Sequence, residues 1–212
     1  MASPVHHCQS FSHDVHLTAQ RQSGAGRGPE EVILVDACDH PIGAAEKRAA
    51  HESGLLHRAF SIIVYDRAGR MLLQQRARSK YHSGGLWSNT CCSHPRPGED
   101  TEQAAHRRLI EEMGFDCQLE RVHEFVYRVE VDNGLIEHEY DHVFVGRCDA
   151  SPRHHPDEVE AWCWIDPNDL QREAERRPEH FTYWFKRCLA ELSKLSLPGL
   201  RLAIAGDGGG PG

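Results

Sequence analysis

A thiol and an imidazole lie two residues apart, at Cys92 and His94 in the segment SNTCCSHP. If this segment is extended, both side chains leave the backbone on the same side. Thiol and imidazole groups can both exchange protons with a bound molecule. The segment therefore predicts a reactive site.

Two carboxylates are also spaced by two residues, at Glu137 and Glu139. A strand over 136–147 would place these two and Asp141 on one face, with His138, Tyr140 and His142 on the other. Neighbours on one strand face are roughly 7 Å apart, so the two glutamates could reach one cation. The alternative interpretation of this pattern is a solvated polar face.

A short charged helix is predicted to follow the thiol and imidazole. Prolines and a glycine in 95–98 stop regular structure, and Asp100 or Thr101 can cap the helix. Arg108 and Glu112 are one helical turn apart and share a face. The alternative interpretation of this pair is a surface salt bridge.

The elements that must position these side chains follow from periodicity and turns. Asp66-Arg67-Ala68-Gly69 and Asp132-Asn133-Gly134 are turn sequences, each of which predicts a hairpin. Apolar residues at helical spacing predict a helix over 181–195 that packs on the sheet. Residues 46–50 are predicted to form a polar segment, with Lys47 and Arg48 exposed. Strands are predicted at 32–35, 60–65, 71–75, 122–131, 136–147 and 158–165.

Length and charge limit the function. The 212 residues predict one domain over 30–205, preceded by a disordered extension, 1–29, and followed by a flexible tail, 206–212. A net charge of -8 disfavours a nucleic-acid partner but allows a small anionic substrate where cations cluster. Because no apolar run could span a bilayer, we expect a cytoplasmic protein. The eight cysteines contain no CxxC pair, so most should be buried thiols.

The segment 93–114 resembles a Nudix box. In that motif a glycine, a glutamate after five intervening residues and an Arg-Glu-x-x-Glu-Glu-x-Gly helix hold magnesium on a diphosphate. Ser93 replaces the glycine and Arg108 replaces a glutamate, which weakens the prediction of a hydrolase. The matching residues are Glu99, Arg107, Glu111, Glu112 and Gly114.

The surrounding motifs resemble the type 1 isopentenyl-diphosphate isomerases, a Nudix-like branch that isomerises its substrate. Several independent motifs in the right order make this resemblance specific. It implies an α+β fold, a Nudix-like mixed β-sheet sandwiched by helices. The motifs are AEKRAAH (45–51), LLHRAF (55–60), QQRARSK (74–80), SNTCCSHP (88–95), FVYR (125–128) and EHE (137–139).

The resemblance also implies two metal ions. One divalent ion would be bound by three imidazoles and two carboxylates, a set that suits first-row metals, so manganese, magnesium and zinc stay open. A second ion, magnesium, would be held by Glu112, the main-chain oxygen of Cys92 and the substrate diphosphate. The implied ligands of the first ion are His51, His57, His94, Glu137 and Glu139.

The implied substrate is isopentenyl diphosphate, which gains one proton at its alkene and loses another from the neighbouring carbon. Cys92 and Glu139 match the residues that carry out these transfers, and Tyr127 is a candidate proton relay or hydrogen-bond partner of Glu139. Trp184 matches an aromatic side chain that can face a carbocation, with helix core as the alternative. Cys91 is a bystander, since only Cys92 is at the matching position. The cations that match diphosphate ligands are Lys47, Arg76, Lys80 and Arg108.

Two rival functions remain at this stage. A Nudix hydrolase of a nucleoside diphosphate derivative is disfavoured by Arg108, and a catalytically idle metal-binding module would need neither Cys92 nor Glu139. Ser83-Gly84-Gly85 stands where the family has Pro-Gly, which predicts a more mobile loop after Lys80. The sequence leaves open the oligomeric state, the cellular metal, the downstream isoprenoid and the use of the N-terminal extension.

Overall fold

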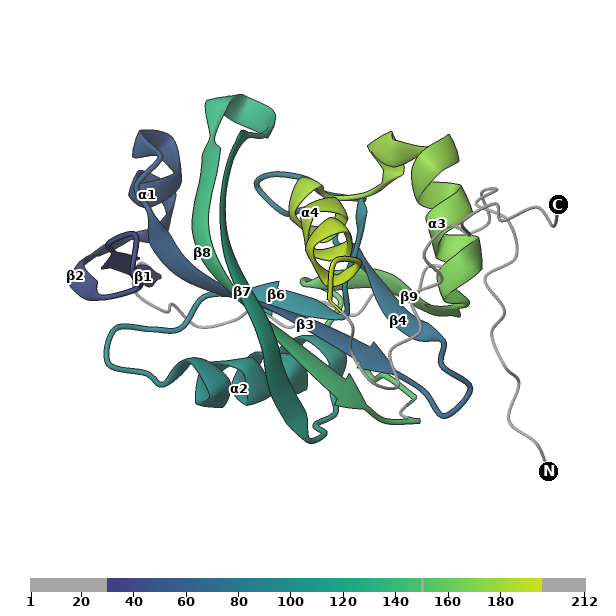
Figure 1. Cartoon of the computed structure of the whole chain (residues 1–212). Helices are drawn as coiled ribbons and strands as arrows, with labels where there is room; N and C mark the ends of the chain where they lie inside the picture. The colour runs from purple at the N-terminus through teal and green to yellow at the C-terminus, as the bar shows by residue number, and fades with distance from the viewer. Residues whose placement is uncertain (1–29, 150, 196–212) are drawn as a thin grey trace, which may run out of the picture.

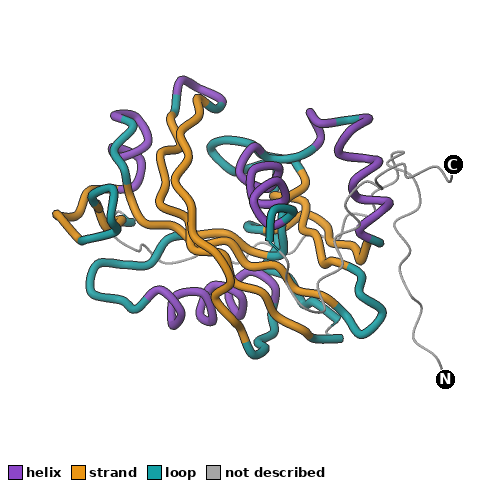
Figure 2. Tube along the Cα trace, viewed as in Figure 1, coloured by secondary structure: helices purple, strands orange, loops and turns teal. Residues whose placement is uncertain are grey.

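A mixed β-sheet forms the centre of the protein, with helices on both faces (Figures 1 and 2). The computed structural model describes residues 30–149 and 151–195; the predicted extension, tail and last ten residues of the predicted domain lie outside them. The elements are β1 (Glu31–Val35), β2 (Pro41–Glu46), α1 (Lys47–Ser53), β3 (His57–Tyr65), β4 (Met71–Arg76), β5 (Trp87–Ser88), β6 (Cys91–Ser93), α2 (Thr101–Met113), β7 (Leu119–Glu130), the 3₁₀ turn η1 (Asp132–Gly134), β8 (Ile136–Arg147), β9 (Val159–Ile165), α3 (Pro167–Arg176), η2 (Pro178–His180) and α4 (Tyr183–Leu192). The predicted α+β architecture is confirmed.

The predicted hairpin of β7 and β8 is confirmed along its whole length, from Leu119 opposite Gly146 to Glu130 opposite Ile136. Its turn suits its sequence, because Asn133 has a φ of 62° and asparagine tolerates this left-handed region better than most residues. In Figure 1 this hairpin extends well beyond the rest of the sheet. It therefore forms one wall of the structure at that end.

The predicted hairpin of β3 and β4 is confirmed only next to its turn. The strands pair at Tyr65 and Met71 and then diverge, because β4 pairs with β5 and β9. β3 instead pairs in parallel with β8 and in antiparallel fashion with β6. The parallel pairing was not predicted, since it joins segments about 80 residues apart and leaves no local sequence signal.

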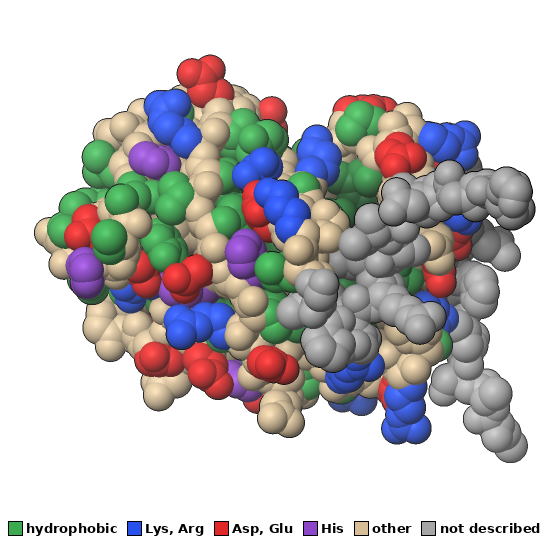
Figure 3. Space-filling model, viewed as in Figure 1, with side chains coloured by type: hydrophobic (Ala, Val, Ile, Leu, Met, Phe, Trp, Pro, Cys, Tyr) green, Lys and Arg blue, Asp and Glu red, His purple; other side chains and the backbone are tan. Residues whose placement is uncertain are grey.

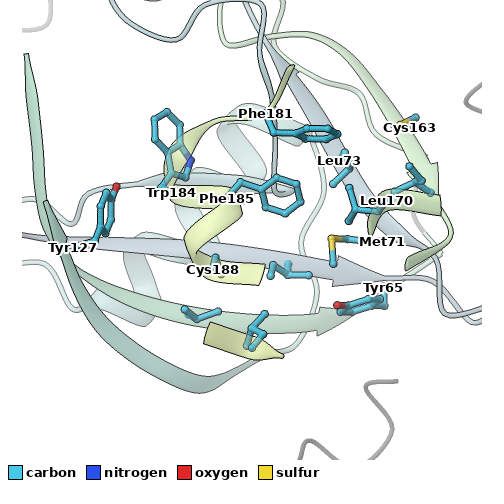
Figure 4. Close-up of a cluster of buried hydrophobic side chains, with 14 residues drawn as sticks. Tyr65, Met71, Leu73, Tyr127, Cys163, Leu170, Phe181, Trp184, Phe185 and Cys188 are labelled. Carbon is cyan, nitrogen blue, oxygen red and sulfur yellow. The ribbon is translucent and has the colours of Figure 1, made fainter. Parts of the chain in front are cut away.

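Alternate residues of β3 point to the two faces of the sheet and enter two separate hydrophobic cores. Ile63 packs in the core under α4, while Ile62 and Val64 pack in the core under α2. Figure 4 shows the first core, with Trp184 and Tyr127 at one end and Tyr65 toward the other. The predicted helices α2 and α4 thus cover opposite faces of the sheet, each with its apolar side toward the sheet.

The segment predicted to be simply polar is the short helix α1. Glu46 caps it by accepting hydrogen bonds from the amides of Arg48 and Ala49, and Gly54 ends it in a left-handed conformation. Arg48 is exposed as predicted, but the prediction for Lys47 is wrong, because its side chain is only 20% exposed. α1 turns His51 inward, where it is fully buried.

Two further sequence predictions concern cysteines and membranes. Of the described cysteines, Cys91, Cys163 and Cys188 are buried, whereas Cys38 is exposed and the others are half-buried. The prediction of mostly buried thiols is therefore only partly correct. Within 30–149 and 151–195, no helix is long and apolar enough to cross a bilayer.

Candidate active site

A cleft of about 480 Å³ lies at the end of the sheet where β8 and α4 face each other. His51, His57 and Tyr127 lie just behind the lining, in contact with Glu137 or Glu139. The other residues predicted for the site all line the cleft: Lys47, Arg76, Lys80, Cys92, His94, Arg108, Glu112, Glu137, Glu139 and Trp184.

Strand register brings the acidic residues to this place. Glu139 of β8 is opposite Tyr127 of β7 on one side and opposite His57 of β3 on the other. Glu137 and Glu139 are 3% and 7% exposed. The alternative of a solvated polar face is therefore wrong, and the predicted division of β8 into an acidic face and an opposite face is confirmed.

Five buried side chains form a cluster that could hold a metal ion. One potential ligand atom from each residue lies within 4.8 Å of all the others. They come from α1, β3, the segment after β6, and β8. The cluster consists of His51, His57, His94, Glu137 and Glu139, the set that the resemblance implied.

Main-chain carbonyls orient two of these imidazoles. Nδ1 of His51 donates to the carbonyl of Lys47 at 2.6 Å, and Nδ1 of His57 donates to that of Leu55 at 2.8 Å. Each ring therefore turns a lone pair on Nε2 toward the cluster, as in metal-binding histidines. Nε2 of His57 is buried without a hydrogen-bond partner in the described part of the chain. A metal ion would give this atom a partner.

The spacing of the donor atoms also fits an ion. Nε2 of His51 is 3.2 Å from Oε2 of Glu137, and Nε2 of His94 is 2.8 Å from Oε1 of Glu139. Nε2 of His57 is 3.7 Å from the same Glu139 oxygen. Ligand atoms held at ~2.1 Å from one ion at right angles are ~3 Å apart. The residues present thus suit a divalent ion.

The electrostatics of the cluster favour a cation. Burial lowers the pKa of His57 to about 4 and holds the pKa of His94 well below its ordinary value, so both rings are neutral at pH 7. Burial and the adjacent Glu137 carboxylate raise the pKa of Glu139 well above its ordinary value. Burial acts in the same direction on Glu137, but the adjacent His51 and His82 rings outweigh it and hold that pKa low. A divalent ion would stabilise both carboxylates in ionised form.

A thiol and a phenol are held on either side of the cleft. The hydroxyl of Tyr127 donates to Oε2 of Glu139 at 2.6 Å. The indole Nε1 of Trp184 is 3.1 Å from Sγ of Cys92 and 3.0 Å from Oγ of Ser88. Burial raises the pKa of Cys92 to about 12, against a smaller opposing effect of Arg76, so its thiol carries a proton at neutral pH. Trp184 belongs both to the cleft and to the core, so its two interpretations are not exclusive.

Arg108 is the centre of a buried ion-pair network. It donates to Oε1 of Glu112 at 2.5 Å, to Oε2 of Glu111 at 2.7 Å and to Oε1 of Glu158 at 3.1 Å. Arg108 and Glu112 are 9% and 4% exposed, so the alternative of a surface salt bridge is wrong. Lys80 pairs with the other oxygen of Glu158. Glu158 therefore joins two cations that line the cleft.

The two remaining cations differ in their pairing. Lys47 pairs with Glu30 at 3.1 Å. Arg76 has no carboxylate within ion-pair distance among the described residues; it donates to the carbonyl of His82 at 3.3 Å and lies 5.0 Å from the ring centre of Trp184. Lys and Arg side chains are visible beside the hollow between the β7–β8 hairpin and α4 in Figure 3. Four cations therefore line the cleft, and three of them are paired with carboxylates.

Sequence reasoning missed three polar residues of this region: His82, Ser88 and Glu158. His82 lines the cleft with its Nε2 3.0 Å from Oε1 of Glu137. Its only local signal was its place in a basic, glycine-containing loop. Ser88 and Glu158 lie beside predicted motifs, but a single serine or glutamate gives no periodicity from which a contact could be inferred.

The comparisons with known proteins agree with this geometry. The family model described as NUDIX domain matches residues 55–185. Solved structures share the fold: that of DR0079 from Deinococcus radiodurans covers 69% of this chain and 90% of its own, with a TM-score of 0.58 and 18% identity. A MutT NUDIX hydrolase from Burkholderia pseudomallei covers 65% of this chain and 98% of its own, with a TM-score of 0.52 and 24% identity.

Relatives with higher sequence identity show to which branch of the Nudix family the chain belongs. A protein of Aromatoleum aromaticum named isopentenyl-diphosphate delta-isomerase 2 is 54% identical over 76% of this chain and 85% of its own length. A Burkholderia multivorans protein named isopentenyl-diphosphate delta-isomerase is 56% identical over 78% of this chain and 94% of its own. The chain therefore belongs to the Nudix family, in the branch formed by the isopentenyl-diphosphate isomerases.

Proposed function

We propose that this protein interconverts isopentenyl diphosphate and dimethylallyl diphosphate. The observation that carries the proposal is that the Cys92 thiol and the Glu139 carboxylate, each with its own hydrogen-bond partner, line one cleft beside a group of cations. The names of relatives at 54% and 56% identity support the same reaction. Localisation in the cytoplasm stays a prediction.

The reaction needs one proton donor and one acceptor. A proton is added to the terminal alkene carbon, a tertiary carbocation results, and a proton is removed from the neighbouring carbon to give the new double bond. Cys92 can supply a proton because burial keeps its thiol protonated. Glu139 can exchange a proton with substrate or with the Tyr127 hydroxyl, which donates to its Oε2.

Aromatic and buried groups protect the carbocation intermediate from attack by water. The indole of Trp184 can stabilise positive charge through its π surface without reacting as a nucleophile. Its Nε1 also fixes the position of the Cys92 sulfur at 3.1 Å. Because Cys92, Glu139 and Trp184 are largely buried, little water has access to the reacting carbons, which favours isomerisation over hydration.

The diphosphate would be bound by Lys47, Arg76, Lys80 and Arg108, all of which line the cleft. Guanidinium groups can donate two hydrogen bonds to phosphate oxygens. A divalent ion in the His/Glu cluster would neutralise its two carboxylates, and a magnesium ion at Glu112 would add positive charge at the diphosphate. The ion in the His/Glu cluster is manganese, magnesium or zinc.

The test is incubation of the protein with isopentenyl diphosphate and a divalent ion in heavy water, followed by NMR. The expected result is formation of the dimethylallyl product with deuterium uptake and no released phosphate. Phosphate release from nucleoside diphosphate derivatives without isomerisation would instead identify a hydrolase. Neither product would identify a binding module, and either of the last two results would overturn the proposal.

A further inference from the structure

His82 is a buried cleft residue outside the predicted site. It lies in the segment between β4 and β5 and is 5% exposed. Its ring centre is 5.8 Å from that of Trp184 and 5.8 Å from that of His51. It is not one of the five clustered residues whose ligand atoms lie within 4.8 Å of one another.

His82 contacts the Glu137 oxygen that is not directed toward the cluster. Oε2 of Glu137 is 3.2 Å from Nε2 of His51, inside the cluster, whereas Oε1 is 3.0 Å from Nε2 of His82. The two carboxylate oxygens therefore have different partners on different sides. The 3.0 Å contact of His82 with Oε1 restricts rotation of the carboxylate and keeps Oε2 directed toward the cluster.

The main chain on both sides of His82 is attached to the turn η1. The amide of Ser83 donates to Oδ2 of Asp132 at 3.0 Å, and Nδ2 of Asn133 donates to the carbonyl of Tyr81 at 2.9 Å. We call residues 81–83 the docked segment. Its attachment leaves the His82 side chain directed into the cleft between two anchored neighbours.

The residues after His82 are adapted to this conformation. Ser83 has a φ of 50° and Gly85 a φ of 80°. A Cβ atom on Gly84 would lie 2.8 Å from the carbonyl oxygen of Arg78, so this position needs glycine. The two glycines, which predicted a more mobile loop, thus serve a defined turn that places His82.

The main chain of His82 also contacts the cationic side of the cleft. Its carbonyl oxygen accepts a hydrogen bond from Nη2 of Arg76 at 3.3 Å. Arg76 is otherwise without a carboxylate partner among the residues that the structure describes. The same loop residue thus contacts a carboxylate of the cluster and a cation of the diphosphate site.

We propose that His82 is a positioning residue for the metal site: its imidazole holds Glu137 in the orientation that an ion requires, and the docked segment holds His82. This inference rests on the metal site included in the proposed function. Hydrogen-bond partners of metal ligands fix ligand geometry, and their removal commonly weakens metal affinity by ~10–100-fold. His82 has this relation to Glu137.

The test measures binding of Mn²⁺ alone to the full chain, by electron paramagnetic resonance of free Mn²⁺. His82→Ala is expected to weaken affinity by about 10-fold or more. His82→Gln, whose amide can still donate to Glu137, should restore affinity to within about threefold of the unchanged protein. His106→Ala is the matched control, because His106 also contacts a carboxylate, Asp116 at 2.6 Å, but on the outer surface; it should bind Mn²⁺ normally.

A second variant keeps the test valid if His82→Ala does not fold. Asp132→Ala removes the anchor of Ser83 at an exposed turn, and we expect a smaller loss of Mn²⁺ affinity, about threefold, with the bound-Mn²⁺ spectrum broadened. Unchanged affinity in folded His82→Ala, or in Asp132→Ala if only that variant folds, would overturn the role of His82. Absence of Mn²⁺ binding to the unchanged protein would overturn the metal site itself, and this inference with it.

Discussion

The two ends of the cleft carry side chains of opposite charge. At the His/Glu end, two buried carboxylates are surrounded by three imidazoles, and Nε2 of His57 has no hydrogen-bond partner among the described residues. At the opposite, cationic end, Lys47, Lys80 and Arg108 are each already paired with a carboxylate. The first end is suited to an ion that stays bound, whereas the second is suited to an anion that must leave.

The pairing of the cations explains this difference. A carboxylate such as Glu158 positions Lys80 and Arg108 but also repels an approaching diphosphate, so it lowers the net attraction. Substrate and product carry the same diphosphate, and very tight binding of this group would slow product release without accelerating the chemistry. A resident metal ion has no such requirement. The following predictions test the residues at the two ends of the cleft separately.

The largest effect is expected from the reacting groups. Cys92→Ala and Glu139→Gln should each lower kcat by ~10³-fold or more, since each removes a group assigned to proton transfer. For Cys92→Ala, the Kd of inorganic pyrophosphate should stay within about threefold, because the cations are untouched. Calorimetry and the NMR assay measure the two quantities.

The neighbouring Cys91→Ala is the matched control for the thiol. Cys91 is fully buried in the core under α2 and does not line the cleft. This variant should retain turnover within a factor of a few, at some cost in stability. Near-normal turnover of Cys92→Ala would contradict the assignment of the thiol.

Metal removal should come next in size. Treatment with a chelator is expected to lower turnover by at least ~100-fold, and added Mn²⁺ should restore it. Because an ion that binds only the folded state stabilises it, Mn²⁺ at 100 times its Kd should add about 2.7 kcal/mol to the free energy of unfolding. Thermal unfolding with and without Mn²⁺ measures this term. Equal stability in both conditions would show that the His/Glu end holds no ion.

A smaller effect, on KM, is expected from variants of the cations at the other end of the cleft. Arg76→Gln should raise KM by ~10–100-fold, since a hydrogen bond to a charged group contributes about 1.5–3 kcal/mol. Lys47→Gln should raise KM less, by a factor of a few, because Lys47 shares its charge with Glu30. Steady-state kinetics of the two variants compares an unpaired with a paired cation. A larger effect of Lys47→Gln would contradict the comparison.

The smallest effect concerns stability at low pH. Lys80 and Arg108 outweigh burial and lower the pKa of Glu158 to about 2, from an ordinary 4.5. Folding therefore favours its ionised form, so the stabilisation is present above pH 4.5 and is lost as the pH falls toward 2. With allowance for solvent screening of this quarter-exposed side chain, it should contribute ~1–2 kcal/mol.

Urea unfolding of Glu158→Gln and the unchanged protein measures this contribution. The difference in free energy of unfolding should be largest near pH 6 and should shrink toward pH 2.5. Glu160→Gln is the matched control, because Glu160 pairs with the exposed Arg78 and should show little difference at either pH. A difference for Glu158→Gln that does not change with pH would contradict an ionic origin.

Local sequence signals predicted the elements better than their pairing. The turn Asp132-Asn133-Gly134 predicted the β7–β8 hairpin, and Asp100, one of two predicted caps, does cap α2. The helices α1 and α3 were missed because their sequences are short and polar and tertiary contacts stabilise them. The edge strand β2 was missed because its six residues contain only one β-branched side chain and therefore give little strand signal. The family resemblance, and not spacing, brought residues from distant segments into one predicted site.

The predicted site residues do gather at one cleft, but their chemical roles remain predictions. His82 shows why the site could not be completed from sequence. Its contact with Glu137 joins positions 55 residues apart and depends on anchors in η1, so no local pattern contains it. Glu158 reaches Arg108 over 50 residues for the same reason.

The parallel pairing of β3 with β8 also has a consequence for folding kinetics. It places His57 opposite Glu139 although 82 positions separate them, and closure of so long a loop is slow. β6 and α2 can assemble on β3 earlier, since they follow it more closely in the chain. Binding of Mn²⁺ during refolding would therefore report the pairing of β3 with β8, because His57 and Glu139 come together only when these two strands pair.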